Sequence, residues 1–217
     1  MPIFAGMKLV FATGNEGKLR EARQILEGVC EVVSQTEAGV SGEAEENAPT
    51  LKGNSLLKAE YVYGRCALDC FADDTGLEVD ALGGAPGVRT ARFAGDIALR
   101  DGREPVQSHV FSANIDALLG ELEKHPGEPR TARFHSVVTL ILGGEKHFFE
   151  GVLEGSIALQ RSGHGGFGYD PVFISSDYPD RSVAELPDEV KNAISHRGKA
   201  LRAMAEWLRS RNVQVNQ

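Results

Sequence analysis

Two adjacent carboxylates, Asp73 and Asp74, follow an apolar run that ends at Phe71. If this run is a buried strand, it delivers both acids to the carboxyl edge of a sheet, where α/β proteins usually hold their ligands. Because adjacent strand residues point to opposite faces, we expect one acid to face a cleft and the other to face inward or to cap backbone amides. A turn with a capping Asp before Thr75-Gly76 is the alternative, since these are common turn residues.

A glycine loop follows the first predicted strand, residues 8–12, and reads Thr13-Gly14-Asn15-Glu16-Gly17-Lys18. A helical pattern comes next, with these apolar residues on one face: Leu19, Ala22, Ile25 and Leu26. A strand, loop and helix in this order direct backbone N–H groups at an anion, and Lys18 adds a positive charge. The loop is not a Walker A loop, because Leu19 stands where that motif has Ser or Thr. A plain strand-to-helix turn is the alternative.

Residues 37–49 form a predicted acidic loop that carries Glu43, Glu45 and Glu46, although most charged loops are simply solvated. A predicted helix follows over residues 50–63, and Gly64 is placed to end it. Farther along, apolar spacing predicts a helix over residues 111–122. Two strand-like runs, 134–142 and 146–153, then predict a hairpin around Gly143-Gly144.

The densest glycine loop is Gly163-His164-Gly165-Gly166-Phe167-Gly168-Tyr169-Asp170-Pro171, before a predicted strand at 172–174. Four glycines in six residues are costly in conformational entropy, so we favour close approach of the backbone to a ligand as their reason. Phe167 and Tyr169 are then available to stack on a flat ring. A wide flexible loop is the alternative.

Near the C-terminus, Lys191, His196 and Arg197 gather donors suited to a phosphate or a carbonyl oxygen. Ser195 can cap the helix that follows, whose buried residues would be Leu201, Met204 and Leu208. A basic helix face in solvent would have the same pattern.

The composition is that of an ordinary globular protein of 217 residues, with 41% hydrophobic and 25% charged residues. A net charge of −8 argues against non-specific nucleic-acid binding, which relies on Lys and Arg. Three cysteines are an odd number without zinc spacing, and no stretch is apolar enough to enter a membrane, so we expect a cytoplasmic protein. Met7 is an alternative start to Met1, because it can itself begin the first strand.

Taken together, these segments resemble the inosine triphosphate pyrophosphatase family, which cleaves non-canonical purine nucleoside triphosphates. The resemblance covers nearly the whole chain, and its motifs occur in the family's order. They are Ala12-Thr13-Gly14-Asn15 through Lys18, Asn54-Ser55-Leu56-Leu57-Lys58-Ala59, Ala72-Asp73-Asp74-Thr75-Gly76-Leu77, Gly83 to Gly87, Gly166-Phe167-Gly168-Tyr169-Asp170-Pro171, and Ser195-His196-Arg197-Gly198.

The resemblance implies an elongated two-lobed α/β fold, with a central mixed sheet flanked by helices and a nucleotide cleft between the lobes. The single two-lobed domain would span residues 7–210, with terminal extensions at 1–6 and 211–217. It also implies a homodimer, no nucleic-acid or membrane partner, and Mg²⁺-dependent cleavage between the α- and β-phosphates, which yields a nucleoside monophosphate and pyrophosphate.

Residue roles carried over by motif are also implied. Asp74 resembles the family's catalytic base and metal-binding carboxylate, Thr75 its substrate-contacting neighbour, and Glu46 the second metal ligand. Because Ala48-Pro49 and Gly53 depart from the family pattern, Glu45 is the alternative to Glu46. The implied substrate-binding residues are Thr13, Gly14, Asn15, Glu16, Gly17 and Lys18 for the triphosphate, Phe167, Gly168, Tyr169 and Asp170 for the base, and Lys191, His196 and Arg197.

Two other functions are weighed against this one. A nucleotide-binding module without turnover would need the glycine loops but not the carboxylates. A related pyrophosphatase acting on modified pyrimidine or methylated nucleotides would need a different base pocket, whereas the Ser195-His196-Arg197 run favours purines. If His196 or Arg197 donates to O6 of hypoxanthine or xanthine, the amino group of adenine would be rejected.

Overall fold

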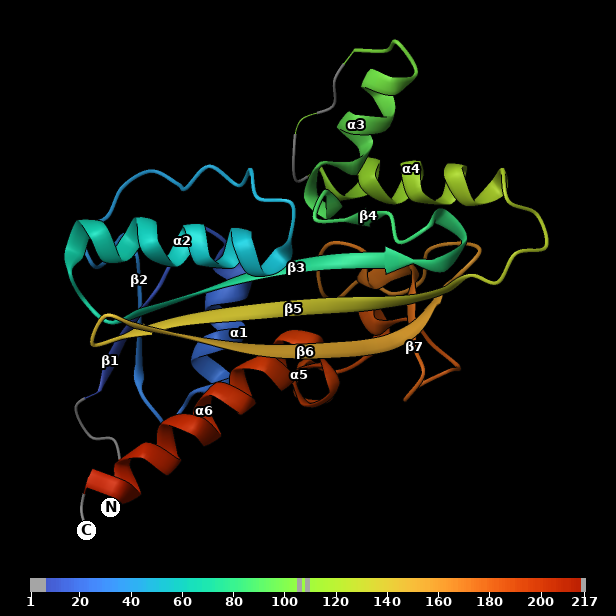
Figure 1. Ribbon diagram of the computed structural model, residues 1–217. Helices are drawn as coiled ribbons and strands as arrows, with labels where there is room; N and C mark the ends of the chain where they lie inside the picture. Colours follow the sequence, from blue (N-terminus) through green and yellow to red (C-terminus); the bar gives the residue numbers. More distant parts are fainter. Residues whose placement is uncertain (1–6, 105–106, 108–109, 216–217) are drawn as a thin grey trace. The chain divides into compact units, whose positions relative to one another are not determined.

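Figure 1 shows the computed structural model of the chain, which describes residues 7–104, 107 and 110–215. The chain divides into two compact units, and each is described by itself. The first unit comprises residues 1–74, 136–151 and 195–217, and the second comprises residues 75–135 and 152–194. Strands β3 (Cys70–Val79), β5 (Thr131–Leu142) and β6 (Glu145–Ile157) each contribute residues to both units.

The sheet has the strand order β2-β1-β3-β5-β6-β7, and β4 (Pro86–Gly87) pairs with β3. Strands β1 (Lys8–Phe11), β2 (Glu31–Ser34) and β3 pair in parallel. By contrast, β4 runs antiparallel to β3, and β7 (Phe173–Ser175) runs antiparallel to β6. The expected α/β fold with a mixed sheet flanked by helices is therefore confirmed.

In the first unit, alternate residues of the strands pack against helices on opposite faces of the sheet. Leu9 and Phe71 belong to a core with helices α1 (Glu16–Ile25) and α6 (His196–Val215). Val10 and Ala72 belong to a second core with helix α2 (Leu51–Cys66). Figure 1 shows α2 on one side of β1 and β3 and α6 on the other. The strand period of two thus decides which helices each residue of β3 can reach.

Strand β3 corrects the expectation that Asp73 and Asp74 end a strand. The strand continues to Val79, so both acids lie within it rather than at its end. The neighbouring strand β1 ends earlier along the sheet: its last residue, Phe11, pairs with Phe71, two residues before Asp73. The acids therefore lie just beyond the carboxyl end of β1, and β3 continues because Leu77 and Val79 are buried in the core of the second unit.

The end of α2 also differs from the prediction. The helix passes through Gly64 to Cys66 and is closed by Ala67, which has a left-handed backbone with φ of 52°. The N–H of Ala67 donates to the carbonyl of Tyr63, as helix C-caps commonly do. Gly64 costs the helix about 1 kcal/mol relative to alanine. Packing of Val62 and Ala59 in the core offsets this cost.

The second unit packs its helices and loops against β3, β5 and β6. Its helices are α3 (Phe93–Arg100), α4 (Phe111–Glu123) and α5 (Asp188–Ile194), and its short 3₁₀ helices are η1 (Asp80–Leu82), η2 (Thr90–Arg92), η3 (Asp170–Val172) and η4 (Val183–Glu185). The core joins Leu118 of α4 to Phe134 of β5 and Phe173 of β7. The helix predicted over 111–122 is confirmed.

The predicted β-hairpin is confirmed, and both of its strands are longer than expected. Gly143 and Gly144 form the turn between β5 and β6, with φ of 58° and 83°. Two successive positive φ angles suit a two-residue hairpin turn, which glycine adopts without strain. The short strand expected at 172–174 is β7, shifted by one residue.

The structure covers only part of the two terminal extensions expected at residues 1–6 and 211–217. Residues 1–6 lie outside the described residues, and helix α6 runs through residue 210 to Val215. None of the helices within the described residues has the length and apolarity that a membrane span requires.

Candidate active site

The Thr13–Lys18 loop connects β1 to α1 and is stabilised by its own side chains. Asn15 is the N-cap of α1, and its side-chain oxygen accepts from the N–H of Lys18 at 3.0 Å. The Thr13 hydroxyl accepts from the N–H of Asn15 at 3.1 Å. By helix geometry, the N–H groups of Glu16 and Gly17 have no carbonyl partner inside α1. The loop therefore ends in a helix N-terminus that favours anions.

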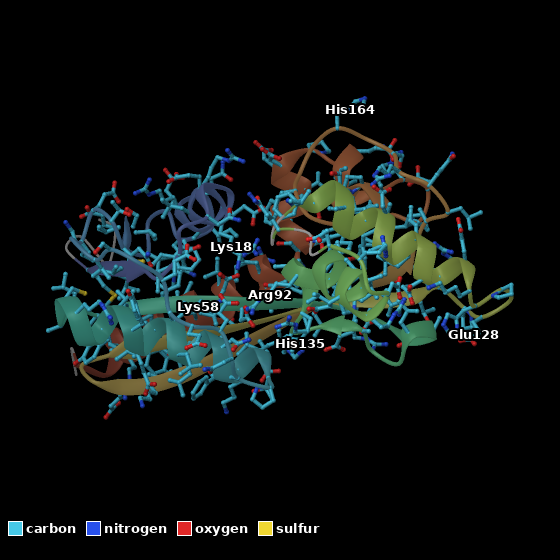
Figure 2. All side chains as sticks on the ribbon, turned by 90° about the horizontal axis from the view of Figure 1, so that it is seen from above. Lys18, Lys58, Arg92, Glu128, His135 and His164 are labelled. Carbon is cyan, nitrogen blue, oxygen red and sulfur yellow. The ribbon has the colours of Figure 1, made fainter. Side chains whose placement is uncertain are left out.

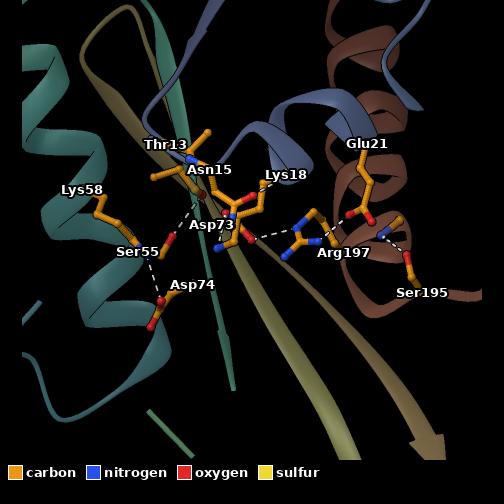
Figure 3. A network of polar contacts seen from close by, with 12 residues as sticks. Thr13, Asn15, Lys18, Glu21, Ser55, Lys58, Asp73, Asp74, Ser195 and Arg197 are labelled. Atoms are coloured by element: carbon orange, nitrogen blue, oxygen red, sulfur yellow. Dashed lines mark hydrogen bonds and ion pairs between the residues drawn. The ribbon is translucent and has the colours of Figure 1, made fainter. Parts of the chain in front are cut away.

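Asp73 joins this loop to helix α6 through a buried ion-pair network (Figure 3). Its carboxylate lies 3.0 Å from Lys18 Nζ and 3.0 Å from Arg197 Nε, and the guanidinium of Arg197 also contacts Glu21 of α1. Burial would raise the pKa of Asp73, but Lys18 and Arg197 outweigh this effect and hold that pKa well below its usual range. Asp73 is thus the inward-facing acid, and it binds the side chains of Lys18 and Arg197.

Asp74 points to the opposite face of β3 and contacts α2. Lys58 Nζ lies 2.9 Å from Asp74 Oδ1 and 3.0 Å from Glu46 Oε1, so one ammonium joins two carboxylates. Burial raises the pKa of Asp74, and Lys58 partly offsets that rise. Nearby, the Ser55 hydroxyl lies 2.7 Å from Thr139 Oγ1 and 3.2 Å from the carbonyl oxygen of Ala72, which fixes α2 against β3 beside the acids.

Lys58 is a residue that the sequence-based list of site residues missed. Lys58 occurs in the motif Asn54 to Ala59. It is 16 residues away from Asp74 in the sequence, so no local pattern indicated that the two side chains pair. Figure 2 labels Lys58 and Lys18, which come from α2 and α1. The two lysines contact the two adjacent acids of β3 from opposite faces, Lys18 through Asp73 and Lys58 through Asp74.

Ser195 caps α6 as predicted, with its hydroxyl accepting from the N–H of Gly198 at 2.9 Å. The cap sets the first turn of the helix, which holds His196 and Arg197. Both side chains are buried, with 8% and 3% exposure. At least two donors of Arg197 are already bound to Asp73 and Glu21. Arg197 is therefore a structural link between α6, α1 and β3.

In the second unit, Asp170 organises the dense glycine loop. Its carboxylate accepts from the N–H of Phe167 at 2.9 Å and lies 2.9 Å from Lys191 Nζ. The same ammonium lies 4.6 Å from the centre of the Phe167 ring. The centres of the Phe111 and Phe167 rings are 6.2 Å apart. Lys191 is thus paired with Asp170 of its own unit. His164 is exposed at the tip of the loop (Figure 2).

The structure corrects one expectation about this loop and adds a second reason for its glycines. The Tyr169 ring is 3% exposed and its hydroxyl donates to the carbonyl of Thr90 at 3.0 Å, so Tyr169 cannot stack on a ligand. The glycines also have intramolecular reasons. A Cβ at Gly166 would collide with the Asp170 carboxylate, and a Cβ at Gly163, where φ is 77°, would lie 2.7 Å from the backbone of Ala184.

The sequence model of the Ham1 family matches residues 9–207 of this chain. The chain belongs to the Ham1 family. A Ham1 relative from Porphyromonas gingivalis, named dITP/XTP pyrophosphatase, is 50% identical over 93% of this chain and 97% of its own length. A relative of the same name from Flavobacterium johnsoniae is 41% identical over 93% and 98% of the two chains.

Solved structures of Ham1 proteins agree with the fold. The HAM1 protein from Coxiella burnetii has a TM-score of 0.82, with 33% identity and coverage of 94% of this chain and all of that chain. A dITP/XTP pyrophosphatase from Mycobacterium abscessus has a TM-score of 0.70, with 39% identity and coverage of 91% and 98%.

The carboxylate oxygens beside Lys58 are the candidate ligands for a metal ion. Among the described residues, no group of three or more His, Cys, Asp or Glu side chains converges as a ready-made metal site. Asp74 and Glu46 nevertheless share the Lys58 ammonium, so the protein already places one positive charge between two carboxylates. Mg²⁺ often takes only one or two protein carboxylates, with water and substrate phosphates completing its shell, so this pair fits it.

Proposed function

We propose that this protein hydrolyses non-canonical purine nucleoside triphosphates, namely ITP, dITP and XTP, to the nucleoside monophosphate and pyrophosphate. Membership of the Ham1 family and the dITP/XTP pyrophosphatases among its relatives support this activity. The observation that carries it is the arrangement around β3. Lys18 of the glycine loop pairs with Asp73, and Lys58 pairs with the adjacent Asp74 and with Glu46. Such a site combines anion binding with a carboxylate base.

In the proposed reaction, Asp74 orients the attacking water and accepts its proton. Burial raises the pKa of Asp74, which makes it a better base than an exposed Asp, and Lys58 keeps it ionised. Lys18, oriented by Asp73, and the N-terminus of α1 hold phosphate oxygens. Asp74 and Glu46 would hold Mg²⁺, which would neutralise phosphate charge and polarise the phosphoryl oxygens. Glu46 is favoured over Glu45, because it shares the Lys58 ammonium.

For the base, we propose that the half-buried Phe167 ring provides the stacking surface. Asp170 binds the N–H of Phe167 and the ammonium of Lys191, and the buried Tyr169 anchors the loop through Thr90. His196 is the proposed donor to O6 of the base, since Arg197 has committed donors to Asp73 and Glu21. Thr75, directly after Asp74 in β3, completes the substrate contacts.

We also infer a homodimer located in the cytoplasm. The free cysteines Cys30, Cys66 and Cys70 support a reducing compartment. Light scattering after size-exclusion chromatography would measure the dimer directly.

The deciding experiment incubates purified protein and Mg²⁺ with ITP, dITP, XTP, ATP, GTP and modified pyrimidine triphosphates, and identifies the products by chromatography. We expect IMP and pyrophosphate from ITP, with slow turnover of ATP. Inosine diphosphate as the first product would contradict cleavage at the α–β linkage. Binding without turnover would support a sensor, and preference for a pyrimidine would support the related pyrophosphatase.

Replacing Lys58 with Met is expected to lower kcat/KM for ITP by about 10- to 100-fold, the loss of one charge-assisted contact. It should also reduce the Mg²⁺ concentration needed for half-maximal rate, because Asp74 and Glu46 lose the cation that they share. The matched control is Lys52→Met, which removes an exposed lysine of the same helix. An unchanged or higher Mg²⁺ requirement in Lys58→Met would show that the ammonium and the metal do not share these carboxylates.

A further inference from the structure

Residues 41–48, here called the acidic strap, are held at their first end by Gln35, which directly follows β2, and by α2. The Gln35 side chain donates to the carbonyl of Gly42 at 2.9 Å. The Tyr61 hydroxyl donates to the carbonyl of Ser41, also at 2.9 Å. A Cβ at Gly42 would lie 2.6 Å from the Tyr61 oxygen, so the strap touches α2 closely at this point.

The second end of the acidic strap is fastened to the same helix. The Glu46 carboxylate lies 3.0 Å from Lys58 Nζ, and the Asn54 side chain accepts from the N–H of Ala48 at 2.9 Å. Asn54 is buried, with 1% exposure, so this anchor is shielded from solvent. The strap is therefore held at both ends, and the residues between have a defined position.

Between these anchors, Glu43 lies against the Thr13–Lys18 loop. A Cβ added at Gly14 would be 2.8 Å from Glu43 Oε1, closer than real Cβ contacts. The rest of the Glu43 side chain is exposed, so no burial requirement explains its position. A carboxylate thus lies beside the backbone of the loop that we propose to bind phosphate.

A carboxylate at this position opposes the loop's attraction for anions. The helix N-terminus and Lys18 attract negative charge, whereas Glu43 repels any further anion that approaches Gly14. Two unit charges 4 Å apart in water interact strongly enough to change a binding constant by about fivefold. A polyphosphate carries several charges when free and fewer when a divalent cation is bound to it. Repulsion by Glu43 is therefore strongest for the metal-free ligand.

We infer that Glu43 is a specificity-determining residue for the charge state of the ligand. Its carboxylate makes the loop reject metal-free polyphosphate and accept polyphosphate whose charge a divalent cation has partly neutralised. The inference rests on the proposed function, because it takes the Thr13–Lys18 loop as the phosphate site. It adds a role for the acidic strap that neither metal binding by Glu46 nor catalysis by Asp74 supplies.

The test measures binding of pyrophosphate by calorimetry at low ionic strength, first with EDTA and then with Mg²⁺. In EDTA, Glu43→Gln should bind pyrophosphate at least about fivefold more tightly than the unmodified protein. With Mg²⁺ the gain should fall below about twofold, and high salt should also reduce it, because salt screens exposed charges. The matched control is Glu27→Gln, which removes an exposed carboxylate elsewhere in the same unit and should leave affinity unchanged.

Lys18→Ala separates failure of this inference from failure of the proposed site. If Lys18→Ala weakens pyrophosphate binding but Glu43→Gln behaves like Glu27→Gln, the loop binds phosphate and the role of Glu43 is refuted. Equal tightening by Glu43→Gln with and without Mg²⁺ also refutes it, because a steric effect would not depend on ligand charge. If Lys18→Ala leaves affinity intact, the loop is not the phosphate site, and both the inference and this part of the proposed function fail.

Discussion

Replacing Asp74 with Asn is expected to lower kcat for ITP hydrolysis by about 10²–10⁴-fold, the usual contribution of a general base, with weaker metal binding adding to the loss. Asn keeps the shape of the side chain but cannot accept a proton. Because burial raises the pKa of Asp74, a neutral side chain should cost the fold little. Steady-state rates at saturating Mg²⁺ test the catalytic loss, and thermal melting tests the fold.

The matched control for Asp74 is Asp177→Asn, which neutralises an exposed carboxylate and should leave kcat unchanged. Near-normal turnover by Asp74→Asn at saturating Mg²⁺ would remove Asp74 from the chemistry. A large fall in melting temperature would instead mean that the Lys58 ammonium depends on Asp74 for its place in the fold.

Replacing Asp73 with Asn is expected to lower the free energy of unfolding by about 3–5 kcal/mol, because it breaks a buried ion pair and leaves its partners charged. Asp73 is 1% exposed and contacts both Lys18 and Arg197. Urea unfolding at neutral pH measures the loss. The matched control is Glu31→Gln, which breaks the exposed Lys8–Glu31 pair and should cost less than about 1 kcal/mol.

A double variant tests the cause of that loss. Adding Lys18→Met to Asp73→Asn removes one of the two cations that lose the Asp73 carboxylate, whereas Arg197 keeps its contact with Glu21, so part of the lost stability should return. The two changes are in contact and should therefore be non-additive, with a coupling of about 0.5–3 kcal/mol. Strictly additive losses would mean that Asp73 stabilises the fold by some means other than this network.

Asp73 also shows how the role of a residue depends on partners that lie far away in the sequence. The sequence predicts only that one of the two adjacent acids faces inward. In the structure, Asp73 orients Lys18 and fixes Arg197, two residues that the family resemblance had assigned to the substrate. Its substitution should therefore reduce both stability and substrate binding.

Local chemistry in the sequence was sufficient for many elements. Ser195 could be recognised as a helix cap, and Gly143-Gly144 as a hairpin turn, because each depends on bonds or angles within a few residues. Errors of extent arose where tertiary packing outweighed a local signal. Helix α2 continues through Gly64 because Ala59 and Val62 are packed in one core, and β3 continues past Asp74 because Leu77 and Val79 are packed in another.

By itself, the sequence determined the order of the motifs, the family and the fact that Asp73 and Asp74 must face opposite ways, since a strand alternates its side chains. Only the tertiary structure decided which acid meets which partners. Asp73 meets Arg197 from 124 residues away, and Asp74 meets Lys58 from 16 residues away on the other face. No local pattern encodes such pairs, because they depend on which helices cover each face of β3, and that is settled only when the cores on both faces pack.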